Sequence, residues 1–102
     1  MVAVSIDDDR LGELCRRWSV VELALFGSVL RADFGEESDI DVLVTYANGS
    51  RRGLFEHMRL EEELSRLLGR RVDLVSRRGL DFSRNVLRRD AILNSAEQIY
   101  VS

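Results

Sequence analysis

The sequence has no proline and no lysine, and it carries a single cysteine, Cys15, among its 102 residues. One cysteine cannot build an internal disulfide framework, so we expect a reducing, cytoplasmic environment in which Cys15 packs as a small buried hydrophobe. No apolar run approaches the ~18 residues that a membrane-spanning helix needs, so no membrane span is expected. The first residues lack a basic segment followed by an apolar one, and we therefore expect no secretory signal.

A large charge of one sign is also missing, because the formal net charge is only −3 at pH 7. This value argues against broad electrostatic binding to nucleic acid. All basic residues are arginines, and many stand in pairs: Arg16-Arg17, Arg51-Arg52, Arg70-Arg71, Arg77-Arg78 and Arg88-Arg89. The pairs have two interpretations, a solvated surface or a grip on phosphates or on an acidic partner. The sequence leaves both open.

The length predicts one domain, residues 1–102, with no separate substrate-binding module. Hydrophobic residues make up 45% of the chain, enough for one small core. Hydrophobic periodicity and turn signals predict an α+β fold, a small sheet flanked by helices. The predicted elements are a helix over 7–18, strands over 20–26 and 39–46, a helix over 52–69, a strand over 71–76, and one or two helices within 81–100.

The clearest helix, 52–69, has an apolar stripe of four leucines and a stop signal at Gly69; the stripe consists of Leu60, Leu64, Leu67 and Leu68. We expect Trp18 and Phe55 to belong to the core. His57 lies in the same helix, and we interpret it as a packed or solvent-facing side chain rather than a catalytic one.

The second predicted strand opens with two aspartates, Asp39 and Asp41, which are poor strand residues. Alternate positions of a strand place both carboxylates on one face, roughly 7 Å apart at Cα. Unpaired, such like charges repel and raise one another's pKa. A hard divalent cation such as Mg²⁺ between them removes that cost, so we interpret them as metal ligands.

A third carboxylate, Asp73, interrupts the predicted strand "RVDLVS". If this strand lies beside the strand of Asp39 and Asp41, all three carboxylates meet on one face. Two bridged metal ions about 3.5–4 Å apart could then activate an attacking hydroxyl and neutralise a leaving pyrophosphate.

The first strand ends at Gly27-Ser28, which we interpret as a phosphate-binding turn. Glycine lets a phosphate approach the backbone closely, and the following N–H groups and the serine hydroxyl can donate to it. Each motif alone is weak evidence. Their joint order, namely strand, Gly-Ser, Asp-x-Asp, helix and a strand with a central aspartate, is much more specific.

These residues, "GSVLRADFGEESDIDVLV" followed by "VDLV", resemble the nucleotidyltransferase superfamily that includes the DNA polymerase beta-type fold. At this length the chain looks most like the minimal nucleotidyltransferases, the MNT-domain antitoxins encoded beside HEPN-domain toxins. The resemblance covers nearly the whole chain, although its specific part is confined to 26–44 and 72–75. It implies a mixed sheet with flanking helices, a nucleoside triphosphate substrate, and Mg²⁺.

Carried over by position, the resemblance makes Asp39, Asp41 and Asp73 metal ligands and catalytic residues, with Asp73 also the general base. Gly27 and Ser28 would hold the triphosphate. It further implies ATP as substrate, two Mg²⁺ ions, and a tyrosine of a HEPN ribonuclease toxin as acceptor. Family members often have Arg-Gly after the Gly-Ser, whereas here Ala32 follows the arginine, so Arg31 is not assigned as a phosphate contact.

Three hypotheses stay open at this stage. The first is an enzyme that adenylylates its toxin partner and thereby acts as an antitoxin. The second is a binding protein that neutralises the toxin stoichiometrically. The third is an enzyme of the same fold that modifies a small-molecule hydroxyl. The partners expected are the toxin and the nucleotide, with no direct nucleic acid and no membrane; homo- or hetero-oligomers are both compatible with the sequence.

Overall fold

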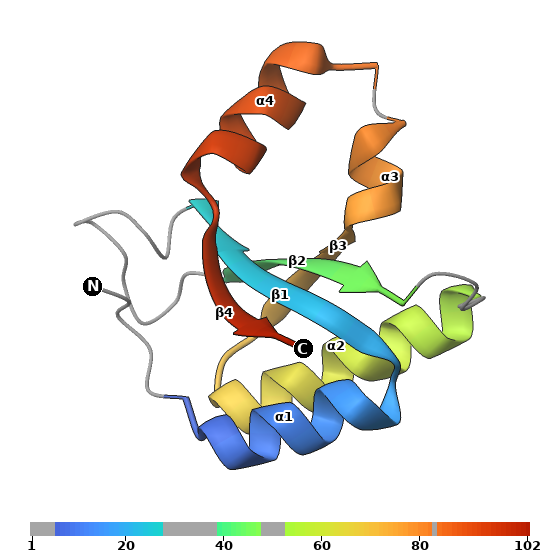
Figure 1. The fold of residues 1–102 in the computed structure, drawn as a ribbon, viewed down its shortest axis with the longest axis vertical. Coiled ribbons are helices and arrows are strands. Elements are labelled where there is room, and N and C mark those ends of the chain that lie inside the picture. Colours follow the sequence, from blue (N-terminus) through green and yellow to red (C-terminus); the bar gives the residue numbers. More distant parts are fainter. Residues whose placement is uncertain (1–5, 28–38, 48–52, 83) are drawn as a thin grey trace.

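The computed structural model describes residues 6–27, 39–47, 53–82 and 84–102 (Figure 1). Their elements, in chain order, are α1 (Asp8–Arg17), β1 (Val20–Phe26), β2 (Ile40–Tyr46), α2 (Leu54–Leu68), β3 (Val72–Ser76), α3 (Arg77–Asp81), α4 (Val86–Ser95) and β4 (Glu97–Val101). None of these helices combines the length and the apolar composition needed to cross a membrane.

The four strands form one sheet in the order β3-β2-β1-β4. β1 pairs antiparallel with β2 and with β4, whereas β2 and β3 are parallel. In Figure 1 the sheet separates α1 and α2 on one side from α3 and α4 on the other. The predicted α+β fold, a small mixed sheet flanked by helices, is therefore confirmed.

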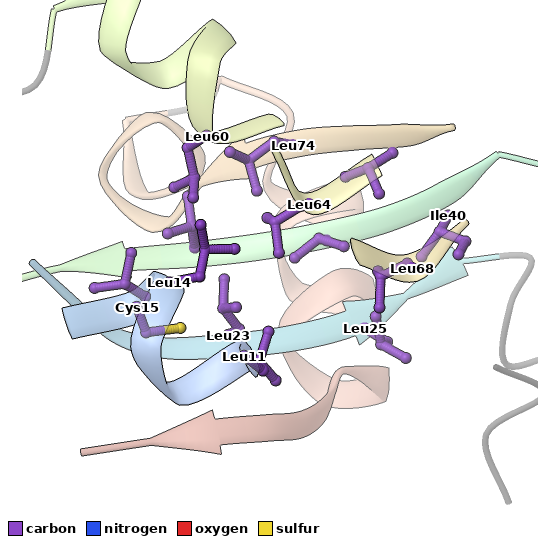
Figure 2. Close-up of a cluster of buried hydrophobic side chains, with 14 residues drawn as sticks. Leu11, Leu14, Cys15, Leu23, Leu25, Ile40, Leu60, Leu64, Leu68 and Leu74 are labelled. Carbon is purple, nitrogen blue, oxygen red and sulfur yellow. The ribbon is translucent and has the colours of Figure 1, made fainter. Parts of the chain in front are cut away.

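The larger core fills the side of the sheet that α1 and α2 cover (Figure 2). On α2, Leu60, Leu64 and Leu68 recur every four residues and are all buried, as the predicted stripe requires. They meet the buried side chains of alternate strand residues, which include Leu23, Leu25, Ile40, Val42 and Val44. Each fully buried side chain of this kind stabilises the fold by about 1.5–3 kcal/mol, so this layer holds the sheet in place.

α1 is capped at its N-terminus by a side chain, and it also packs on the larger core. The Asp7 carboxylate accepts hydrogen bonds from the backbone N–H groups of Asp9 and Arg10, at 3.1 and 3.2 Å. Cys15, one turn from the end, is fully buried, as predicted. Burial raises the pKa of its thiol from 9.0 to about 12, against the opposing effect of the nearby Arg16 charge. The thiol is therefore protonated and packs as an apolar group.

A smaller core lies on the opposite side of the sheet. It consists of Ala24, Phe26, Leu43, Leu80 and Ile92, the last two contributed by α3 and α4. In α4 only Ile92 is buried. This side of the sheet is therefore covered less completely than the side that carries the larger core.

Two local predictions are wrong. Residues 97–100 were expected to be helical, but Glu97–Val101 form β4, because the edge of β1 supplies hydrogen-bonding partners that outweigh local propensity. Phe55 was expected in the core but is 82% exposed. The reason is that the buried contacts of α2 start only at Leu60, so its first turn has no core to pack against.

Candidate active site

Asp41 of β2 and Asp73 of β3 are direct partners across two parallel strands. Neighbouring strands are ~4.8 Å apart and partnered side chains point to the same face, so the two carboxylates lie side by side. The strand of Asp73 therefore lies beside the strand of Asp41, which was the condition for the predicted carboxylate site. Asp39 immediately precedes β2 and is exposed, two residues before Asp41.

The carboxylates lie on the less covered side of the sheet. Ile40 and Val42, the neighbours of Asp41, point into the larger core, so Asp41 points to the opposite side. Leu43 and Val75, two residues after Asp41 and Asp73, belong to or pack against the smaller core on that side. Asp73 is exposed and Asp41 is partly buried. The two carboxylates are thus accessible to solvent, while the neighbouring strand residues are buried in the larger core on the opposite side of the sheet.

Gly27 lies against the carboxylate of Asp41. It follows Phe26, the register partner of Asp41 on β1, and has a positive φ of 75°. A Cβ built at Gly27 would overlap Oδ2 of Asp41 and lie 3.2 Å from its Cγ. Only glycine accommodates both the backbone conformation and the close approach of the carboxylate. The structure therefore joins the glycine turn to the aspartate pair.

The remaining site predictions fall partly outside the described residues. Ser28 and Arg31 lie within 28–38, which the structure does not describe, so their roles stay predictions. The Nε2 and Nδ1 atoms of His57 contact the Leu74 carbonyl oxygen and the Tyr46 hydroxyl, at 2.8 and 3.2 Å. Because a carbonyl only accepts, Nε2–H donates to the Leu74 oxygen. The interpretation of His57 as a packed side chain agrees with these contacts.

The described side chains do not form a complete binding cage for Mg²⁺, but two of their carboxylates fit a Mg²⁺ ion that also binds a nucleotide. Within residues 6–27, 39–47, 53–82 and 84–102, no three His, Cys, Asp or Glu side chains are gathered as a ready-made metal cage. Mg²⁺, however, is usually bound by one or two carboxylates, with water and substrate phosphates completing the octahedron. The adjacent Asp41 and Asp73 provide hard oxygen ligands of this kind on an accessible face. The residues therefore fit a metal that binds together with a nucleotide.

A set of polar side chains on α2, not predicted from the sequence, supports β3. Ser65 Oγ accepts from the N–H of Val72 at 3.0 Å, and Glu61 Oε2 accepts from the N–H of Leu74 at 2.8 Å. With His57, these α2 residues recur every four positions, which places them along one side of the helix. That spacing, next to the leucine stripe, was the signal available in the sequence.

A mixed sheet with a glycine turn against one of two paired strand carboxylates is the arrangement expected of a nucleotidyltransferase core. Residues 10–98 match the family model described as "Nucleotidyltransferase domain". The chain belongs to this family, as its motifs predict.

Curated relatives are named as protein adenylyltransferases. Protein adenylyltransferase MntA of Thermococcus cleftensis is 43% identical over 68 residues, which are 67% of this chain and 67% of the relative. A Methanocaldococcus jannaschii protein, named as a candidate protein adenylyltransferase, is 36% identical over 64 residues, 63% of this chain and 64% of that protein. The match therefore spans slightly less than two thirds of the length of the second relative.

Solved structures share the fold over most of the chain. A minimal nucleotidyltransferase is 39% identical, with a TM-score of 0.66, and the match covers 87% of this chain and 85% of that one. A toxin–antitoxin complex with AMP-PNP is 22% identical, with a TM-score of 0.69 and coverage of 95% and 75%. A complex of an MNT antitoxin with tri-AMPylated Shewanella oneidensis HEPN toxin is 23% identical, with a TM-score of 0.61 and coverage of 93% and 70%. At such identities the last two matches establish the fold.

Proposed function

We propose that this chain is a Mg²⁺-dependent protein adenylyltransferase that moves AMP from ATP to a tyrosine of a HEPN toxin and thereby acts as its antitoxin. The observation that carries the proposal is the register of Asp41 with Asp73, together with the contact between Gly27 and the Asp41 carboxylate. The reaction belongs in the cytoplasm, where ATP and an intracellular toxin are both present.

In this reaction the tyrosine oxygen attacks the α-phosphorus of ATP. A new oxygen–phosphorus bond forms, the bond from the α-phosphorus to the bridging oxygen breaks, and pyrophosphate leaves. Asp73 accepts the hydroxyl proton as general base, a role that suits a carboxylate exposed beside the site. Asp39, Asp41 and Asp73 would hold two Mg²⁺ ions, which when bound supply charge neutralisation for the triphosphate and the leaving group.

The triphosphate belongs beside Gly27. With no Cβ at this position, the backbone of the turn and the Asp41 carboxylate are already in contact, so a triphosphate at the turn would lie beside a metal ion that this carboxylate holds. Ser28 would add its hydroxyl as a further donor. The partial cover of this side of the sheet leaves Asp73 accessible to an acceptor that a second protein brings.

The HEPN toxin is proposed as that second protein because related folds occur in such complexes, one of them with an AMPylated toxin. Exposed apolar side chains at the end of α3 and on α4 could also contact a partner. Phe82, Val86 and Leu87 are 78%, 48% and 85% exposed. Apolar side chains of this size contribute strongly to protein interfaces when a partner covers them.

The same exposed side chains favour a second candidate function, a non-catalytic antitoxin that binds the toxin one for one. The two candidates differ in stoichiometry. With ATP and Mg²⁺, a catalyst silences an excess of toxin, whereas a binding protein silences only an equal amount. Titrating toxin ribonuclease activity with substoichiometric amounts of this chain separates them.

In the direct test, this chain is incubated with α-labelled ATP, Mg²⁺ and the HEPN-type protein encoded beside it, and label on that protein is measured. We expect label on the toxin, and we expect Asp41→Asn to abolish it while the complex still forms. Asp8→Asn is the matched control, because Asp8 is an exposed aspartate on α1, which covers the side of the sheet opposite the one to which Asp41 points. Label that survives in Asp41→Asn would contradict the mechanism, and tight binding without any label would favour the non-catalytic antitoxin.

A further inference from the structure

Asp73 lies on β3, one of the two outer strands of the sheet, whose single strand neighbour among the described residues is β2. An outer strand is held on one edge by its partner and presents unpaired backbone groups on the other. The position of Asp73 relative to Asp41 therefore depends on whatever holds the outer edge of β3.

α2 holds that edge with three side chains. In a strand, alternate residues direct their backbone N–H and C=O groups to opposite edges. The Arg71 carbonyl points toward β2, where it accepts from the Ile40 N–H at 2.8 Å. Asp73, two residues later, therefore also directs its backbone N–H and C=O groups toward β2. Val72 and Leu74, on either side of Asp73, direct their backbone N–H and C=O groups away from β2, toward α2.

The outward groups are bonded on both sides of Asp73. Ser65 Oγ accepts from Val72 N–H at 3.0 Å, and Glu61 Oε2 accepts from Leu74 N–H at 2.8 Å. His57 Nε2–H donates to the Leu74 carbonyl oxygen at 2.8 Å. The three contacts bracket Asp73 and restrain β3 against sliding along β2 or tilting away from it.

We propose that Glu61 and Ser65 are positioning residues for Asp73. The inference rests on the proposed function, because it assigns these residues to the geometry of the same carboxylate site. Neither side chain touches the substrate: α2 covers the side of the sheet opposite the one to which Asp73 points. They act through the backbone of β3.

Two physical arguments favour a positioning role. A displacement of about 1 Å in a catalytic group can cost about 100-fold in rate, so a loosely held outer strand would harm the reaction before it harmed the fold. A carboxylate that accepts from a backbone N–H also forms a stronger bond than a neutral acceptor does. Glu61 uses this stronger bond at Leu74, directly after Asp73.

The experiment measures binding of Mn²⁺, in the presence of a non-hydrolysable ATP analogue, by the loss of the free Mn²⁺ signal in electron paramagnetic resonance. The variants are Glu61→Ala, Glu61→Gln and Ser65→Ala, with Asp73→Asn as the reference for loss of the carboxylate. Glu62→Ala is the matched control, because Glu62 is the next residue of α2 and pairs with Arg66 at 2.9 Å on the helix surface. Amide hydrogen exchange at Leu74 reports the backbone bond, and thermal unfolding reports the fold.

We expect Glu61→Ala to weaken Mn²⁺ binding by about tenfold or more, in the range for residues that support metal ligands, and to accelerate exchange at Leu74. Glu61→Gln, which keeps a carbonyl acceptor, should restore most of the affinity, and Ser65→Ala should show a smaller loss. Glu62→Ala should match the unaltered chain. If Glu61→Ala does not fold, Ser65→Ala, which removes the acceptor of the Val72 N–H, still decides the question.

The contrary outcome is a lower unfolding temperature for Glu61→Ala and Ser65→Ala with unchanged Mn²⁺ affinity. That result would mean that α2 only covers the edge of the sheet, and it would overturn the inference while the proposed function stands. If Asp73→Asn itself leaves Mn²⁺ binding and nucleotidyl transfer unchanged, the third carboxylate of the proposed function is wrong and the inference fails with it.

Discussion

Replacing Gly27 with alanine should destroy nucleotidyl transfer at a modest cost in stability. Gly27 has φ of 75°, a left-handed conformation that costs an L-residue about 1–2 kcal/mol. The new Cβ would also overlap Oδ2 of Asp41, so the carboxylate must rotate or the turn must shift. A displacement of about 1 Å in a catalytic group can reduce the rate about 100-fold. The loss of activity should therefore exceed what the loss of stability explains.

A matched control is present in the same chain. Gly69, which ends α2, has φ of 68°, yet a Cβ built there meets no atom within 4 Å. Gly69→Ala therefore carries the same backbone cost without the collision with Asp41. For a domain of this size, 1 kcal/mol corresponds to a shift of about 4–8 °C in the unfolding temperature.

The assay compares both variants with the unaltered chain at 25 °C, where all three are expected to be folded. Urea unfolding gives the loss in free energy, and transfer of labelled AMP gives the rate. We expect both variants to lose at least about 1 kcal/mol. Gly69→Ala should transfer at the normal rate, and Gly27→Ala at about one hundredth of it or less. Equal activity in the two variants would refute the reasoning that the missing Cβ is needed for the Asp41 carboxylate.

Three further predictions concern the fold and do not require activity. Leu64→Ala should lower the free energy of unfolding by about 2–5 kcal/mol in urea, because Leu64 is completely buried in the larger core. Asp7→Ala should lower it by about 1 kcal/mol, because α1 loses its cap, and a control at exposed Asp8 should not. Burial raises the pKa of Cys15 to about 12 from 9.0. The unfolded thiol therefore ionises first, so stability should fall as pH rises from about 9 towards 12, and Cys15→Ala should remove this part of the pH dependence. An unfolding curve that keeps the same alkaline slope in Cys15→Ala would contradict that assignment.

Local patterns were enough for much of the fold. The cap at Asp7, the stop at Gly69 and the leucine stripe of α2 act over one or two helical turns, so neighbouring residues specify them. The strand that follows Asp39 was readable for the same reason, because its buried residues alternate with less buried ones at its start. Local patterns were not enough for 97–101, whose conformation depends on the edge of β1, or for Phe55, whose exposure depends on where the core ends.

The sequence by itself determined which side chains could form the site: the aspartates of an Asp-x-Asp strand, an aspartate in a later strand, and a glycine at the end of the first strand. The tertiary structure decided that Asp41, Asp73 and Gly27 meet. β3 pairs in parallel with β2 so that Asp73 is in register with Asp41, and the antiparallel return of β2 along β1 brings Gly27 against the same carboxylate. The physical reason is that side-chain periodicity is a property of neighbouring residues, whereas strand order and register arise from backbone hydrogen bonds and core burial between distant segments.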